Sequence, residues 1–256
     1  MNLVEALILG FVQGLTELLP ISSSGHLVLI QYFLNIKQPG LLLEVILHMG
    51  TLTSICIYFR ADIKELIRTS IKGSPISRKK IYCIFISILP VITFGLFFGN
   101  FIDTLFSPTL VVSMLYINAL ILLMTYFIKE NKQIHITYFI ALIIGIAQIC
   151  ALVPGISRSG ITISTALILG LNKNDAAKYS FLLAIPILFC AGIYQFLFKW
   201  SEILNFDYPL LFISFLTSAI IGYIVIDWLF NIISRGKFYI FSFYCFLVAT
   251  ITFIYN

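Results

Sequence analysis

The chain has 256 residues, of which 60% are hydrophobic and only 11% are charged, and its formal net charge is +5. An ordinary soluble domain carries about 25% charged residues, so this composition excludes one and indicates an integral membrane protein built from α-helices. The sequence shows neither the alternating pattern of barrel strands nor a soluble linker, and we expect a single polytopic membrane domain over residues 1–256. The five cysteines lack paired spacing, which argues against a disulfide framework or a cysteine metal site.

The first segment predicts a re-entrant hairpin. Residues 1–17 have an apolar helical pattern that is too short to cross about 30 Å of hydrocarbon, since spanning takes about 20 residues. Pro20 interrupts the pattern, the serines at 22–24 are natural N-caps, and 27–36 resumes as a second short apolar helix. Broken backbone at membrane depth must be buried in protein or line a wet cavity.

The rest of the first half predicts three full spans and a basic loop. The loop, residues 60–80, places its apolar residues on one helical face, which predicts a short helix lying on the membrane surface. The second half repeats the plan, because apolar segments at 136–153 and 156–171 flank a break at Pro154 and Gly155, and three spans follow. The six predicted spans are 41–59, 81–101, 109–128, 179–198, 208–226 and 238–255.

An offset of 135 residues aligns the two halves, which predicts an internal duplication with repeats at approximately 1–130 and 136–256. Each repeat holds one hairpin and three spans, an odd number of crossings, so the second copy must be inverted relative to the first. Inverted repeats with broken helices place their site near the middle of the bilayer, where the hairpin tips meet. The aligned pairs are Gly10/Gly145, Gln13/Gln148, Ile21/Ile156, Ser22/Ser157, Ser24/Ser159 and Gly25/Gly160.

The distribution of basic residues predicts the orientation. If 60–80, 129–135, 171–178 and 231–237 are cytoplasmic, they hold 13 of the 16 Lys and Arg residues, as the positive-inside rule requires. Both termini and the mouth of the first hairpin are then extracytoplasmic. The positive charge is explained by this topology, and no nucleic-acid partner is expected.

Gln13 and Glu17 are four residues apart and project from one helical face. With the serines beyond them, they could hold a hard divalent cation through oxygen ligands, in the way Mg²⁺ meets a phosphorylated substrate. The alternative is that both side chains bond the backbone of the hairpin. A carboxylate at membrane depth is costly and is by default functional. Glu44 and His48 could line the same cavity or face water at the interface, and we expect neither to be catalytic.

The serines before the two second half-helices, together with Arg158, predict a phosphate site. A helix N-terminus offers free N–H groups and a positive dipole end, although the commoner role of a single serine there is a cap. The guanidinium of Arg158 matches phosphate oxygens, and its alternative role is an ion pair with Glu17. The expected phosphate contacts are Ser22, Ser24, Gly25, Gly155, Ser157, Ser159, Gly160 and Thr162.

His26 lies within a few residues of the serines, close enough for a nucleophile and base pair. A lone membrane histidine also serves as a hydrogen-bonding residue between helices, which is the alternative.

At these residues the sequence resembles a known family. The run Q-G-x-T-E-x-x-P-I-S-S-S-G-H from Gln13 to His26, with P-G-I-S-R-S-G-x-T from Pro154 to Thr162, is similar to the undecaprenyl-diphosphate phosphatases, also known as bacitracin resistance proteins. The resemblance covers essentially the whole chain. It implies hydrolysis of undecaprenyl diphosphate to undecaprenyl phosphate and inorganic phosphate, which recycles the lipid carrier for peptidoglycan synthesis and gives bacitracin resistance. It also implies a bacterial cell (inner) membrane protein whose site opens to the outer face.

Carried over residue by residue, the resemblance assigns metal binding or water orientation to Gln13 and Glu17. It places the hydroxyl and imidazole pair on Ser23 and His26, and phosphate binding on Arg158. We favour Ser23 as the nucleophile with His26 as base or acid, and the reverse stays open. The implied cofactor is a divalent cation, Mg²⁺ or alternatively Ca²⁺. Many members carry glutamate at the position of Gln13, so this chain has one negative charge fewer there.

The expected partners are the polyprenyl diphosphate lipid and the surrounding membrane lipids, and a homodimer is left open. The alternative function is a lipid-phosphate transporter or flippase that uses the same inverted-repeat site. A transporter would tolerate loss of the serine hydroxyl better than loss of Arg158, whereas a phosphatase depends strongly on Glu17, on Ser23 or His26, and on Arg158.

Overall fold

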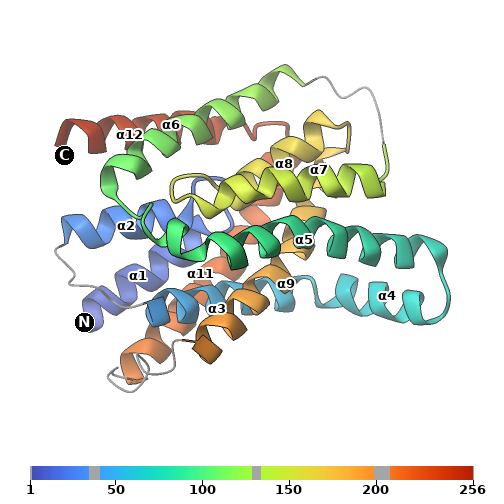
Figure 1. The fold of residues 1–256 in the computed structure, drawn as a ribbon, viewed down its shortest axis with the longest axis horizontal. Coiled ribbons are helices and arrows are strands. Elements are labelled where there is room, and N and C mark those ends of the chain that lie inside the picture. The colour runs from blue at the N-terminus through green and yellow to red at the C-terminus, as the bar shows by residue number, and fades with distance from the viewer. Residues whose placement is uncertain (1, 35–40, 129–133, 199–207, 256) are drawn as a thin grey trace.

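The computed structural model describes residues 2–34, 41–128, 134–198 and 208–255, and within these ranges the chain is helical and contains no strand (Figure 1). Most of the polar link predicted at 129–135 lies outside the described residues. The helices are α1 Leu3–Thr16, α2 Ser23–Phe33, α3 Leu41–Tyr58, α4 Arg60–Ile71, α5 Pro75–Asp103, α6 Pro108–Met124, α7 Tyr138–Gln148, α8 Arg158–Ile168, α9 Lys173–Phe198, α11 Tyr208–Ser234 and α12 Ile240–Tyr255, with 3₁₀ turns η1 Thr125–Phe127 and η2 Ile149–Leu152.

Two broken helix pairs occupy the places where the sequence predicts hairpins. Helices α1 and α2 pack against each other, as do α7 and α8. Helix α2 begins at Ser23, four residues earlier than predicted, because the Ser22 hydroxyl accepts the Gly25 N–H and caps the helix. Ser157 caps α8 in the same way by accepting the Gly160 N–H. The serines therefore belong to the helix starts, with only Ser22 left in the turn.

In the part of the chain that the structure describes, four helices are long and apolar enough to cross a membrane by length and composition. They run over Pro75–Gly99, Pro108–Phe127, Lys173–Tyr194 and Tyr208–Ser234. The segments predicted to span at 41–59 and 238–255 form the shorter apolar helices α3 and α12, of 18 and 16 residues. Large apolar side chains cover the outside, with Phe97 80% exposed. Such a surface is typical of contact with lipid, and the chain is an all-helical integral membrane protein.

Equivalent contacts join the two halves of the chain. Helix α1 packs against α11, and α7 packs against α5. In the first pair Ser214 donates to the carbonyl of Ala6 at 3.2 Å, and in the second Ser87 donates to the carbonyl of Ala141 at 2.6 Å. Ala141 lies 135 residues after Ala6. A small residue at such a contact lets two backbones approach closely in a membrane.

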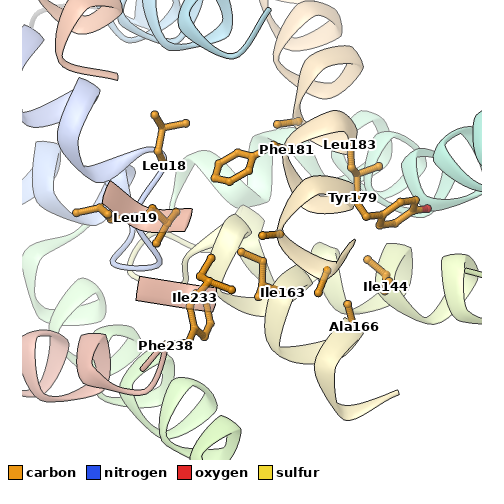
Figure 2. Packing of buried hydrophobic residues seen from close by; sticks show 14 of the residues in the cluster. Leu18, Leu19, Ile144, Ile163, Ala166, Tyr179, Phe181, Leu183, Ile233 and Phe238 are labelled. Carbon is orange, nitrogen blue, oxygen red and sulfur yellow. The ribbon is translucent and has the colours of Figure 1, made fainter. Parts of the chain in front are cut away.

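A cluster of buried apolar side chains lies beside the hairpin tips (Figure 2). Leu18 and Leu19 of the first tip face Phe181 of α9 and Ile163 of α8, and Phe181 is fully buried. Close packing of this kind resists displacement, because any shift opens a cavity or forces an overlap. The tips therefore rest on a packed core that holds them in place.

Helix α4 follows α3 after a one-residue interruption at Phe59, and the N–H of Ile63 still bonds the carbonyl of Phe59. Figure 1 shows α4 running on from α3 beside the beginning of α5, against which it packs. The short helix predicted in the basic loop is therefore present, and its position on the membrane surface stays a prediction.

Candidate active site

Hydrogen bonds join the two hairpin tips, and each connects a serine hydroxyl of one tip with a backbone group of the other. The Gly155 N–H donates to the Ser22 hydroxyl at 3.0 Å, and the Ser157 and Ser159 hydroxyls donate to the carbonyl of Leu19 at 3.4 and 3.1 Å. A Cβ atom on Gly25 would lie 3.1 Å from the Gly155 Cα. These contacts bring the N-termini of α2 and α8 to the same place.

Asn118 of α6 is fully buried, and its side chain makes a hydrogen bond to each tip. Its amide nitrogen donates to the carbonyl of Pro20 at 2.9 Å, and its amide oxygen accepts the Ser157 N–H at 3.0 Å. Sequence reasoning missed this residue, although an asparagine within a predicted span was a usable signal, because polar groups there need partners.

Glu17, Ser23 and Arg158 form a connected charge cluster between the tips. The Ser23 hydroxyl donates to Glu17 Oε2 at 2.5 Å, and Arg158 Nη2 donates to Glu17 Oε1 at 2.9 Å. Arg158 Nη1 donates to the carbonyl of Ser180 at 3.3 Å. The carboxylate side chain is 6% exposed and that of Arg158 is 13% exposed. The ion pair considered from the sequence is therefore present, and it lies directly beside the candidate nucleophile.

Gln13 and His48 complete the carboxylate's surroundings. Gln13 Nε2 lies 3.2 Å from Glu17 Oε2 and 3.3 Å from His48 Nδ1. His48 Nδ1 also lies 2.7 Å from the carbonyl of Glu44, so its Nε2 is the atom that faces Glu17 Oε2, at 3.6 Å. His48 was expected to play no catalytic part, and the structure places it at the edge of the cluster.

His26 does not bond the nucleophile predicted to be its partner. Its Nδ1 lies 2.8 Å from the carbonyl of Ser22, and its Nε2 lies 3.0 Å from the hydroxyl of Tyr244, whose ring stacks on it. Among the described residues no hydrogen bond joins His26 to Ser23, whose hydroxyl goes to Glu17. Tyr244 of α12 was missed, and as one of thirteen tyrosines in apolar sequence it carried no local signal.

The remaining predicted phosphate residues lie around the tips. Ser24 is half-buried, and its hydroxyl lies 3.4 Å from that of Ser22. Thr162 donates to the carbonyl of Arg158 at 2.7 Å and contacts the Ser180 hydroxyl at 2.7 Å. Ser22 and Ser157 act as caps and as links between the tips, so their oxygen atoms already have partners.

The donor set is suited to a phosphorylated ligand. One carboxylate, one guanidinium, a hydroxyl and two helix N-termini converge in a mostly buried space, which is the arrangement that binds and polarises phosphate. The described residues contain no group of three or more His, Cys, Asp and Glu side chains that could hold a metal ion. Gln13 Oε1 is buried and has no hydrogen-bond partner there. Oxygen donors of this kind fit a hard cation only when substrate oxygens complete its shell.

Comparison with known proteins bears on this site. The model of the family "Bacitracin resistance protein BacA" matches residues 6–251. A protein of Geotalea daltonii named undecaprenyl-diphosphatase is 42% identical over 95% of this chain and 94% of its own length. Proteins with the same name from Korarchaeum cryptofilum and Methanococcus maripaludis are 40% and 38% identical, over 97% and 96% of this chain and 97% of their own lengths in both cases.

Proposed function

The chain belongs to the bacitracin resistance protein BacA family, and we propose that it removes the terminal phosphate of undecaprenyl diphosphate, releasing undecaprenyl phosphate and inorganic phosphate. It is thus a hydrolase of a phosphoric anhydride. The reaction recycles the lipid carrier for peptidoglycan synthesis and gives bacitracin resistance. The observation that carries the proposal is the buried Ser23 hydroxyl, which donates to a carboxylate whose other oxygen is held by Arg158.

Ser23 is the nucleophile that the geometry favours, with Glu17 as its base. Its hydroxyl proton already points at Glu17 Oε2, so the carboxylate takes the proton as Oγ attacks the terminal phosphorus. The bond between that phosphorus and the bridging oxygen breaks, and undecaprenyl phosphate leaves. Glu17 releases the proton it took to solvent. Water then attacks the phosphorus of the phosphoserine and gives a proton to Glu17, which passes it to Ser23 Oγ as the bond between Oγ and phosphorus breaks, and inorganic phosphate leaves.

Attack by His26 is the alternative left open by the sequence. His26 Nε2 would have to break its hydrogen bond with the Tyr244 hydroxyl before it could reach phosphorus. Ser23 needs no such rearrangement, and we therefore assign His26 to orienting the tip through the carbonyl of Ser22.

Arg158 binds the phosphate that is transferred. A guanidinium has five N–H donors, and the described contacts use one for Glu17 and one for Ser180, so donors remain for phosphate oxygens. An arriving phosphate draws Arg158 away from Glu17, which makes the carboxylate a better proton acceptor. The free N–H groups at the starts of α2 and α8, with Ser24 and Gly25, supply further contacts.

The cofactor in this proposal is a divalent cation, Mg²⁺ or Ca²⁺. Gln13 Oε1 and Glu17 are the protein oxygens that would hold it, because Gln13 Oε1 is buried and has no donor among the described residues. Such an ion would neutralise negative charge on the diphosphate.

An inverted duplication with two re-entrant hairpins and six spans accounts best for the arrangement of the helices. It is supported by the contact of Ser214 with Ala6 and the equivalent contact of Ser87 with Ala141. In this proposal the cytoplasm is on the side of α4, and the first hairpin and the site open to the outer face of the cell (inner) membrane; the distribution of Lys and Arg residues supports this orientation. A lateral path from the bilayer admits the substrate while its polyprenyl tail stays in lipid.

The test is release of inorganic phosphate from undecaprenyl diphosphate by detergent-purified protein, with Mg²⁺, with Ca²⁺ or with chelator. We expect Ser23→Ala to lower kcat at least about 10³-fold and Glu17→Gln about 10²–10⁴-fold. Ser70→Ala is the matched control, because Ser70 is a buried serine of α4 and lies outside the site. Full activity in Ser23→Ala with none in His26→Ala would reverse the two roles. No phosphate release from folded protein that binds substrate would overturn the proposal.

A lipid-phosphate flippase is the second candidate, because paired hairpins that meet inside the protein are transporter architecture. The Glu17, Ser23 and Arg158 cluster favours hydrolysis. In vesicles, a flippase would move undecaprenyl phosphate across the bilayer with the Ser23→Ala variant still active.

A further inference from the structure

An open groove of about 730 Å³ lies on α4, away from the hairpin tips. Its walls come from α4 and the residues just after it, from Cys56 of α3 and from Ile185 of α9. A groove of this size falls within the range of small-molecule sites, which measure about 300–1,000 Å³. None of its lining residues belongs to the catalytic cluster.

Every charged residue that lines the groove is basic. Arg60, Lys64, Arg68 and Lys72 follow one another at intervals of four, so they form one stripe along the helix, and all four are exposed. Within the described ranges none of them makes an ion pair, and the Arg60 side chain bonds only the carbonyl of Ile57. The stripe therefore presents four uncompensated positive charges.

Helix α4 carries two acidic residues, Asp62 and Glu65, and within the described ranges neither makes an ion pair with the stripe. Asp62 pairs with Lys178 at the start of α9, which ties α4 to the opposite wall of the groove. This ion pair holds the two walls together, and it keeps the Asp62 carboxylate from pairing with the basic residues of the stripe.

An apolar floor runs beside the basic stripe. Ile63, Ile67 and Ile71 each lie one residue from a basic position and line the same groove, together with Cys56 and Ile185. Ile67 is 50% exposed and Ile71 is 78% exposed. A ligand that fills the groove must carry both an anion and a hydrocarbon chain, whereas a free phosphate would leave the isoleucines uncovered.

The length of the helices places the stripe among lipid headgroups. Helices α3 and α4 with Phe59 comprise 31 consecutive residues, from Leu41 to Ile71, and extend roughly 46 Å at 1.5 Å per residue. The hydrocarbon core is about 30 Å thick and the whole bilayer about 40–45 Å. With α3 crossing the core, the stripe reaches the headgroup layer on the side assigned to the cytoplasm, while Cys56 and Ile185 stay at hydrocarbon depth.

We propose that this groove binds one anionic phospholipid of the cytoplasmic leaflet. Its phosphate lies against the stripe of Arg60, Lys64, Arg68 and Lys72, and one acyl chain lies over the isoleucines and down toward Ile185. The proposal does not depend on the phosphatase reaction, because it uses no residue of the hairpin tips.

The test is native mass spectrometry of delipidated, detergent-purified protein titrated with phosphatidylglycerol or with phosphatidylcholine. The wild type retains one phosphatidylglycerol molecule and prefers it to phosphatidylcholine. Each basic residue near an anionic lipid surface contributes about fivefold in affinity, so Arg68→Gln/Lys72→Gln weakens retention by tenfold or more. Lys79→Gln/Lys80→Gln is the matched control, because it removes the same charge from the neighbouring start of α5 outside the groove, and it retains the lipid.

Two further arms separate a lipid site from simpler alternatives. Ile67→Ser lowers retention of phosphatidylglycerol without changing the charge, and glycerol phosphate does not compete. Equal retention of both lipids, an equal loss in the Lys79 and Lys80 control, or full competition by glycerol phosphate would each overturn the proposal. Phosphate release by each variant reports that the fold is intact.

Discussion

Asn118 offers the sharpest test of whether contact between the tips creates the active site. Its side chain joins Pro20 of one tip to Ser157 of the other, and it is fully buried. Asn118→Leu keeps a similar volume but removes both hydrogen bonds. It leaves the buried Ser157 N–H without a partner among the described residues and the Pro20 carbonyl with only the Cys245 thiol, at 4.0 Å. An orphaned buried N–H costs about 1–3 kcal/mol and the weakened carbonyl adds about 1 kcal/mol, which predicts a loss of about 2–4 kcal/mol in the free energy of unfolding.

The effect on catalysis follows from the position of Ser157 directly before Arg158. If the second tip shifts by about 1 Å, Arg158 moves relative to Glu17 and Ser23, and misplacement of that size costs about 10²-fold in rate. We therefore expect kcat to fall about 10²-fold at a temperature where the variant is still folded. The measurements are phosphate release and thermal unfolding of the same detergent-purified sample.

Ser87→Ala is the control for destabilisation alone. Ser87 is also fully buried and also joins two helices, since its hydroxyl bonds the carbonyl of Ala141 and the hydroxyl of Tyr179. It should lower the unfolding temperature and leave kcat near the wild-type value. If Asn118→Leu is destabilised but has wild-type kcat, or if Ser87→Ala loses activity equally, alignment of the tips by Asn118 is refuted.

Three further substitutions test other parts of the site. Gly155→Ala should destabilise the protein by about 2–5 kcal/mol in thermal unfolding, because Gly155 has φ +104 and a new Cβ would lie 2.6 Å from the Met114 Cβ; wild-type stability would contradict this. Gln148→Met should raise the unfolding temperature, because both polar side-chain atoms of Gln148 are buried and have no hydrogen-bond partner among the described residues. A lower unfolding temperature would mean that the Gln148 amide does make hydrogen bonds. Tyr244→Phe keeps the ring but removes the hydroxyl bonded to His26, so kcat should fall about fivefold and the imidazole ¹⁵N shifts should change; neither change would mean that Tyr244 does not position His26.

The hairpin tips were predictable because polar and small residues stand out in an apolar sequence. Glu17, Ser23 and Arg158 could be singled out in this way, and the structure brings all three together. The contacts from α6 and α12 were not predictable, since Asn118 and Tyr244 meet the tips only through packing of segments that are 39 to 218 residues away in the sequence. The partner of the Ser23 hydroxyl was missed for a different reason, because sequence proximity favoured His26 over a carboxylate six residues earlier.

In the proposed duplication, the two halves share one plan but differ at the candidate site. At the offset of 135 residues, Ser22 and Ser157 remain caps, but Ser23 aligns with Arg158 and Glu17 aligns with Leu152. Two copies of Glu17 would repel a diphosphate, and two arginines would leave no nucleophile and no base. Because the halves differ at these two positions, the first tip carries the Ser23 hydroxyl and the Glu17 carboxylate, and the second tip carries the Arg158 guanidinium. In the proposed function the caps kept in both halves preserve the helix starts that bind phosphate, Arg158 of the second tip adds a further phosphate contact, and only the first tip carries the nucleophile and its base.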